Sequence, residues 1–310
     1  MTADSGFASA TANLSITSQG GVGTIPTGLD PNVIAVSPDG TRVYVCNSTD
    51  NTVSVLDILN LSVIRTIPVG LRPRALAVSP DGTRTYISNS WEKTVSVIDA
   101  ATQAVIKTIP VGNNAAGLAV SPDGTRVYIC NNLDDTISVI DTVSLAVILT
   151  VPAGNAPTQI VINPDGTGIY ISSPFNGTVS VMDVKTLSVI ETIPVGNQPD
   201  ALAFSPDGTR VYVSSGSHAV LVIDTAMREV IKTIPVDLQP KGVAVSPDGT
   251  RAYVCNWVWS TVSVIDTVEL EVIQTIPVIE GPNGVAVSPD GTRIFVCNPL
   301  CNFVSVIAVG

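Results

Sequence analysis

Ser121-Pro-Asp-Gly-Thr125 is one of seven copies of a Ser/Asn-Pro-Asp-Gly-Thr segment, and the spacing of these copies decides the fold. Successive copies lie 42, 42, 42, 42, 41 and 42 residues apart, as counted between Asp39, Asp81, Asp123, Asp165, Asp207, Asp248 and Asp290. A period in the low forties, filled with short apolar runs and turn signals, is typical of propeller blades of four strands. The sequence therefore predicts an all-β, seven-bladed β-propeller.

The third repeat shows the four antiparallel strands expected in each blade, at 116–120, 126–130, 136–140 and 146–151. Asp-Gly suits the first turn because glycine accepts a positive φ. The last repeat stops after its third strand, 304–307, whereas a spare outer-strand signature stands at 23–28. We therefore expect the N-terminal strand to complete the last blade and close the ring. Residues 20–310 would form one propeller domain, preceded by an arm at 1–19.

Several short segments of the repeats resemble those of the YVTN-repeat β-propellers. They are the second-strand motif Tyr-Val-Cys-Asn at 44–47 and 253–256, the Ser-Pro-Asp-Gly-Thr turns, and the Ser-Val-Ile-Asp-Thr and Thr-Ile-Pro-Val-Gly segments. Cysteine or serine replaces the threonine of the family motif, which we interpret as a change in packing. The resemblance covers all seven repeats and implies the fold. It does not imply one function, since related seven-bladed propellers include lactonases, lyases, haem or quinone enzymes and binding scaffolds.

Composition excludes several classes of partner. The hydrophobic fraction is 45%, yet no apolar run approaches the roughly 18 residues needed to span a bilayer. The net charge is −11, and the chain has no basic patch with interleaved aromatic residues, so we expect no nucleic acid and no membrane as partner. The first twelve residues lack a basic segment followed by an apolar one. We therefore expect no signal peptide and a cytoplasmic location.

The cysteines and the single histidine argue against a metal or a cofactor. Four cysteines share one second-strand position, where we expect small buried fillers, namely Cys46, Cys130, Cys255 and Cys297. Cys301 lies outside that position and forms only a lone C-x-x-x-C with Cys297. His218 is the only histidine, which excludes a bis-histidine haem and a multi-histidine zinc or copper site. We predict no metal site and no cofactor.

Divergent loops on one face of the propeller are the expected place for a site. The turns after the first and third strands of each blade, the bottom face, are nearly uniform, whereas the loops of the opposite top face differ from repeat to repeat. Six tyrosines and Phe295 fill one core position. Five other aromatic residues fall in or beside the top loops between second and third strands, namely Trp91, Phe175, Trp257, Trp259 and Phe303. They either cap the blades against one another or line an aromatic cup or partner patch.

The first residue of each innermost strand is expected to ring the top of the central channel. In chain order these residues are Asn32, Arg74, Ala116, Thr158, Asp200, Lys241 and Asn283. Asp200 and Lys241 belong to adjacent blades and either pair to plug the channel or act on a ligand. The shortened repeat, of 41 residues, would open the rim at blade 5 and turn His218 toward the axis, unless His218 is a solvated loop residue. Arg72 and Arg74 are expected to clamp a carboxylate or phosphate.

Three functions follow from this arrangement. The first is binding of a small organic ligand, including an anionic one, in the top cup. The second is a non-redox lyase, cyclase or isomerase in which His218 and Asp200 act as acid and base, while Lys241 or Arg74 stabilises negative charge. The third is a scaffold whose top-face aromatic residues hold a partner protein. We favour ligand binding.

Overall fold

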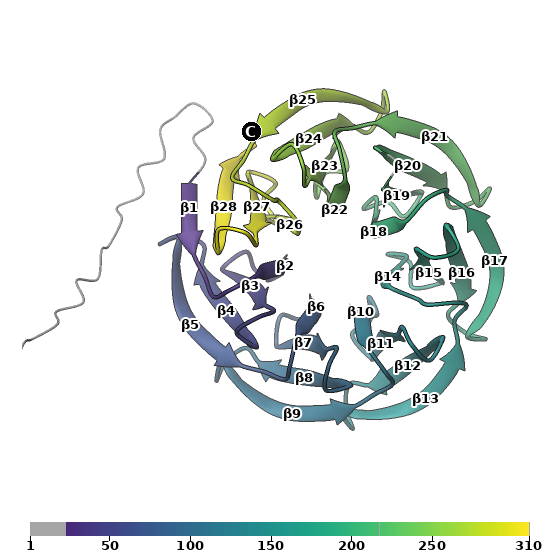
Figure 1. The fold of residues 1–310 in the computed structure, drawn as a ribbon. Coiled ribbons are helices and arrows are strands. Elements are labelled where there is room, and N and C mark those ends of the chain that lie inside the picture. The colour runs from purple at the N-terminus through teal and green to yellow at the C-terminus, as the bar shows by residue number, and fades with distance from the viewer. Residues whose placement is uncertain (1–22, 217, 310) are drawn as a thin grey trace, which may run out of the picture.

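The computed structural model describes residues 23–216 and 218–309, and it confirms the seven-bladed propeller (Figure 1). Each blade is a sheet of four antiparallel strands, and the described residues form 28 strands and no helix. The predicted arm at 1–19 lies outside the described residues.

Each blade runs from an innermost strand at the channel to an outermost strand at the rim. Blades 1 to 3 comprise β2 (Pro31–Val36), β3 (Arg42–Asn47), β4 (Thr52–Asp57) and β5 (Ser62–Pro68); β6 (Pro73–Val78), β7 (Arg84–Asn89), β8 (Thr94–Asp99) and β9 (Ala104–Pro110); and β10 (Ala115–Val120), β11 (Arg126–Asn131), β12 (Thr136–Asp141) and β13 (Ala146–Pro152). Blades 4 to 6 comprise β14 (Gln159–Ile162), β15 (Gly168–Ser173), β16 (Thr178–Asp183) and β17 (Ser188–Pro194); β18 (Pro199–Phe204), β19 (Arg210–Ser215), β20 (Ala219–Asp224) and β21 (Glu229–Pro235); and β22 (Pro240–Val245), β23 (Arg251–Asn256), β24 (Thr261–Asp266) and β25 (Glu271–Pro277). Blade 7 comprises β26 (Val285–Val287), β27 (Arg293–Asn298), β28 (Phe303–Ala308) and β1 (Gly23–Pro26).

The ring closes as predicted. Strand β1 pairs antiparallel with β28, with Thr24 opposite Ser305 and Ile25 opposite Val304, so the N-terminal strand supplies the outermost strand of blade 7. Figure 1 shows β1 beside β28 and next to blade 1. Closure leaves the ring without a free blade end to which another sheet could add.

The apolar core lies between neighbouring blades, because both faces of each sheet are covered. The second and third strands of every blade are almost wholly buried, and the residues of one hydrophobic cluster come from two adjacent blades. The tyrosine position and Phe295 are buried, as predicted, and so are the four cysteines of the shared position. Where serine takes the cysteine position it hydrogen-bonds instead. Ser88 donates to the carbonyl of Ala116 in the next blade at 2.6 Å.

Hydrogen bonds on the bottom face stiffen each turn and join neighbouring blades. In the third blade Ser121 Oγ donates to Asp123 Oδ1 at 2.5 Å, and the Thr125 amide donates to the same oxygen at 3.0 Å. These hydrogen bonds hold the pKa of the Asp123 carboxyl below its usual range. At four of the seven blade junctions the arginine after the turn donates to a carbonyl of the next blade: Arg42 to Ala100, Arg84 to Thr142, Arg210 to Thr267 and Arg293 to Ile58.

Candidate functional site

The innermost strands end at a polar cavity in the mouth of the central channel. It has a volume of about 590 Å³, and six of the seven predicted ring residues line it. Those six are Asn32, Arg74, Thr158, Asp200, Lys241 and Asn283. The seventh, Ala116, is fully buried. The prediction that the first residue of each innermost strand faces the channel is therefore confirmed in six blades. In each of these blades the side chain at this position is longer than a methyl group.

Irregular pairing of the innermost strands accompanies four of the six ring residues that face the channel. In five blades the register between first and second strand shifts at the ring residue, for example between Pro73 and Ala75 around Arg74, and between Pro199 and Leu202 around Asp200. A residue at such a bulge leaves the regular ladder, and its side chain is redirected. The shifts thus redirect the side chains of four ring residues, namely Asn32, Arg74, Asp200 and Lys241. Thr158 and Asn283 reach the channel from the segments before β14 and β26, and Ala116 is buried although it stands at a shift.

Close approach of adjacent innermost strands narrows the ring. The Gly117 amide donates to the Thr158 carbonyl of the next blade at 2.7 Å, and the Gly242 amide donates to the Asn283 carbonyl at 2.9 Å. A Cβ added at Gly117 would lie 2.6 Å from the Thr158 oxygen, which leaves room only for glycine there. These backbone contacts hold the ring residues at fixed positions around the channel.

The charges in the mouth are unevenly paired. Lys241 Nζ lies 2.8 Å from Asp200 Oδ2, so the predicted ion pair forms. Asp200 is the only carboxylate among the described lining residues. Arg74 also lines the cavity, but its guanidinium makes no hydrogen bond or salt bridge with another described residue. Burial lowers the pKa of Arg74 from its usual value, and the nearby Asp200 charge partly offsets that effect.

A second cavity, of about 1090 Å³, opens from the first across blades 4 and 5. The two share Arg74, Thr158, Asp200, Gln239 and Lys241. The remaining wall is made of carboxamides, glycines and prolines together with one aromatic ring, which is that of Phe175. The shared residues make the two cavities one continuous hollow on the top face.

A missing side-chain anchor explains why this second cavity lies at blades 4 and 5. In blades 1, 2, 3 and 6 an asparagine at the end of the second strand donates to a threonine and a serine of the third strand, as Asn131 does to Thr136 and Ser138. Blades 4 and 5 carry Ser173 and Ser215 there. A Cβ at Gly112 would meet Asn131 at 2.5 Å, whereas one at Gly196 would meet no atom within 4 Å. The asparagine that contacts Gly112 thus has no counterpart at Gly196, whose φ of 79° also gives this loop a different backbone from that at Gly112.

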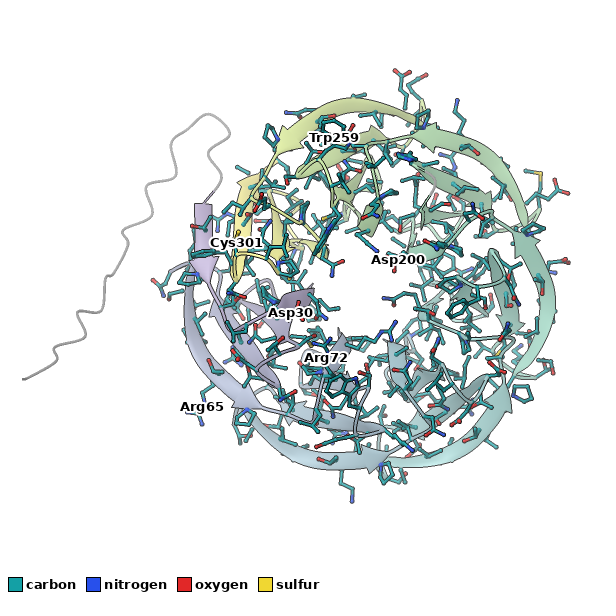
Figure 2. The ribbon with its side chains drawn as sticks, in the orientation of Figure 1. Asp30, Arg65, Arg72, Asp200, Trp259 and Cys301 are labelled. Atoms are coloured by element: carbon teal, nitrogen blue, oxygen red, sulfur yellow. The ribbon has the colours of Figure 1, made fainter. Side chains whose placement is uncertain are left out.

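Arg72 and Arg74 do not form the predicted clamp. Arg72 Nη1 lies 3.6 Å from Asp30 Oδ2, and Figure 2 labels both residues. The guanidinium carbon of Arg72 lies 5.0 Å from the centre of the Trp91 ring. Neither Arg72 nor Trp91 lines either cavity. The bulge at Arg74 separates the two side chains, because it turns Arg74 to the channel while Arg72 remains in the loop before β6. Of these two arginines, only Arg74 lines the mouth and is available to a ligand there.

Two of the five top-face aromatic residues reach the hollow. Trp257 lines the mouth, and Phe175, which is 82% exposed, lines the second cavity. Trp259 is exposed outside both cavities, and Figure 2 shows it over the outer part of its blade. Phe303 pairs with Pro26 in β1 and lines neither cavity. The described residues therefore form no complete aromatic ring around the hollow.

His218 does not approach Asp200 as predicted. It is exposed, has a φ of 68°, and lines neither cavity. Its carbonyl accepts the amide of Val236, which follows the outermost strand β21, so this end of the loop is held away from the innermost strand. The other part of the prediction fits the geometry, because the rim is open at blade 5, where Gly216 lines the second cavity.

Asn32 and Asn283 apart, the carboxamides of the hollow were not predicted from the sequence. Gln159 and Gln239 line the mouth, and Asn197 and Gln198 line the second cavity. Asn197 and Gln198 stand in the loop between blades 4 and 5, where blade 2 has Leu71 and Arg72. The signal that points to this corner is the loss of the asparagine anchor in two successive repeats.

Comparison with known proteins places the chain in a family. The model of the YNCE-like β-propeller family matches residues 22–121, 75–172 and 113–207, and the chain belongs to that family, whose repeats are of the YVTN type. The model of the cytochrome D1 heme domain matches residues 200–290. Among solved structures, the chain is similar to Kuenenia stuttgartiensis hydrazine synthase, with 26% identity and a TM-score of 0.84 over 92% of this chain and 97% of that one. No curated protein sequence matches the chain.

The residues of the hollow do not fit a haem. Haem iron in proteins is held by histidine, cysteine, methionine or tyrosine, and none of these residue types is among the described residues that line either cavity. His218, the only histidine in the segment similar to the heme domain, is exposed away from the channel. Within residues 23–216 and 218–309 no group of three or more His, Cys, Asp or Glu side chains could hold a metal ion.

The same ranges contain no helix long and apolar enough to span a membrane.

Proposed function

We propose that this protein binds a small organic anion in the mouth of its central channel, with Arg74 as the principal partner of the anionic group. The observation that carries the proposal is that the two cationic side chains of the mouth, Lys241 and Arg74, are paired unequally. Lys241 forms an ion pair with Asp200, the only carboxylate among the described lining residues. Arg74 makes no hydrogen bond or salt bridge with another described residue, and the nearby Asp200 charge offsets its burial only in part. Partial burial of a guanidinium that no carboxylate contacts directly is costly, and its planar N–H groups match a carboxylate. An anion in the mouth would offset that cost.

Binding is favoured over catalysis because the expected acid–base pair is not assembled. Asp200 lies in the mouth and His218 does not, so the pair proposed for a lyase, cyclase or isomerase lacks one member. A protein partner on the top face is the second candidate, because Trp91 and Trp259 are exposed and line neither cavity. A cytoplasmic location remains a prediction.

Trp257 supplies a built-in reporter for the test. It is the only tryptophan that lines the mouth, so a Trp91→Phe/Trp259→Phe variant leaves one fluorophore at the site. We would titrate this variant with lactate, succinate and inorganic phosphate, alone and with Arg74→Gln added. The matched control is Arg65→Gln, because Arg65 is exposed on the outer strand β5 (Figure 2).

The expected result is a saturable change in Trp257 emission with at least one of these anions, retained by Arg65→Gln and lost in Arg74→Gln. A flat response to all three anions, or a response that Arg74→Gln leaves unchanged, would overturn the proposal. Circular dichroism of the variants shows whether the propeller is intact, so that a lost response is not confused with a lost fold.

A further inference from the structure

The hollow is much larger than the anionic group that Arg74 would hold. The mouth alone is about 590 Å³ and the adjoining cavity about 1090 Å³, whereas sites for whole organic ligands typically measure roughly 300–1,000 Å³. A carboxylate at Arg74 would therefore leave most of the hollow to the rest of its ligand. The chemistry of the remaining wall indicates what that part is.

Carboxamides dominate the polar part of this wall. Eight of them line the two cavities, namely Asn32, Asn132, Gln159, Asn176, Asn197, Gln198, Gln239 and Asn283. Each carboxamide offers both a donor and an acceptor, as neighbouring hydroxyls do. The side chains of Asn197, Gln198 and Gln239 are exposed and make no hydrogen bond with another described residue, so a ligand can reach them. Asn32 Oδ1 is buried without a partner among the described residues. A hydroxyl-rich ligand would satisfy these groups, whereas an apolar acid would cover them at about 1–3 kcal/mol for each unsatisfied group.

Phe175 gives this polar wall one apolar platform. It lines the second cavity and is 82% exposed, so few protein atoms cover its ring. The face of an aromatic ring is electronegative and attracts C–H groups of partial positive charge, such as those on one face of a sugar ring. The residue at the corresponding place in blade 3, Leu133, is also exposed but lines neither cavity.

The charge of the hollow limits the ligand to a low negative charge. Arg74, Lys241 and Asp200 are the charged residues that line it, and together they carry one net positive charge. That charge matches one carboxylate and is too small for the phosphates of a nucleoside di- or triphosphate. The polar wall, the aromatic platform and the single excess cation are together characteristic of a site for an acidic sugar.

We infer, building on the proposed function, that the ligand is an oligosaccharide containing a uronic acid. Its carboxylate lies at Arg74, its hydroxyls pair with the carboxamides, and a neighbouring sugar unit extends over Phe175. The mouth and the second cavity are then two subsites of one binding site. The sugar unit over Phe175 gives the inference a test that is independent of the anion itself.

The experiment is isothermal titration of the full chain with a matched set of probes. These are lactate, galacturonate, glucuronate, digalacturonate, a glucuronate-containing disaccharide, the neutral disaccharide lactose, and AMP. At least one acidic disaccharide should bind about tenfold or more tightly than its uronate monomer, and lactose should bind weakly. Phe175→Ala should weaken disaccharide binding about tenfold with little change for the monomer, and Leu133→Ala should change neither affinity.

Failure of this inference and failure of the proposed function give different results. If lactate and the uronates bind equally through Arg74, or if Phe175→Ala changes no affinity, the sugar assignment is overturned and the anion site stands. If AMP binds more tightly than both acidic disaccharides, the ligand is a nucleotide instead. If no acid binds, both the inference and the proposed function are wrong.

Discussion

Substitution of Gly117 by alanine tests how tightly the innermost strands approach one another around the channel. The added Cβ would lie 2.6 Å from the Thr158 carbonyl oxygen and 2.7 Å from the Gln159 Cα, both in the backbone of blade 4. Side-chain rotation cannot relieve contacts with a backbone, so blade 4 must move relative to blade 3. Gly117 shows no positive φ, so the effect is steric and not conformational.

The cost can be estimated from two terms. Overpacking against fixed atoms costs about 1–3 kcal/mol. Moving the strands apart also weakens the 2.7 Å hydrogen bond from the Gly117 amide to Thr158, at about 1 kcal/mol. We therefore expect Gly117→Ala to lower the free energy of unfolding by about 2–4 kcal/mol, and to weaken ligand binding because Thr158 and Gln159 line the mouth.

The assay is guanidinium unfolding followed by both circular dichroism and tryptophan fluorescence, with Gly168→Ala as the control. Gly168 is also in a strand and has no positive φ, and its added Cβ would meet only Tyr170, at 3.6 Å. Gly168→Ala should be neutral or more stable by about 0.4–1 kcal/mol, because alanine restricts the unfolded chain. Equal stability of the two variants would refute the close inter-blade approach on which the geometry of the mouth depends.

Three further predictions concern the scaffold. In the six turns that begin with serine, the serine hydroxyl and the threonine amide lower the pKa of the folded aspartate, as at Asp123. The contribution of these six aspartates to stability is complete above the unfolded pKa of about 3.9 and is lost as pH falls through the folded pKa. An unfolding midpoint that does not fall in acid would contradict this. Arg84→Ala should cost about 1.5 kcal/mol by removing the hydrogen bond to Thr142, whereas Arg65→Ala, which breaks no hydrogen bond to a described residue, should cost almost nothing in the same guanidinium assay. Of the five thiols, only Cys301 should react with a disulfide reagent in the native protein, because the other four are buried and burial raises their pKa. All five should react in denaturant. Rapid reaction of more than one thiol in the native protein would contradict this prediction.

Repetition made the fold and the ring of channel residues predictable from the sequence. In a propeller, position within the repeat corresponds to distance from the axis, so the first residue of each innermost strand could be assigned to the channel without coordinates. Asn32, Arg74 and Asp200 are confirmed there by the cavity lining. The spare strand signature at 23–28 likewise predicted the pairing of β1 with β28.

Side-chain direction in the top loops could not be predicted in the same way. Arg72 and Arg74 are two residues apart and were expected to act together, but a bulge at Arg74 turns one to the channel and leaves the other on Trp91. His218 occupies the position of Lys93 in blade 2, and the carbonyl of each accepts an amide that follows the outermost strand. Comparison of the repeats indicates this position, and the shortened loop led the prediction away from it. The second cavity was missed because it results from an absent contact, the asparagine anchor replaced by Ser173 and Ser215.

The central claim is that the guanidinium of Arg74, which makes no hydrogen bond or salt bridge with another described residue, holds an anionic ligand in the channel mouth. The most direct measurement is isothermal titration of the wild type, Arg74→Gln and Arg65→Gln with the acid that gives the strongest Trp257 response. We predict one saturable site in the wild type and in Arg65→Gln, with binding lost in Arg74→Gln. Equal affinity in Arg74→Gln and the wild type would contradict the claim.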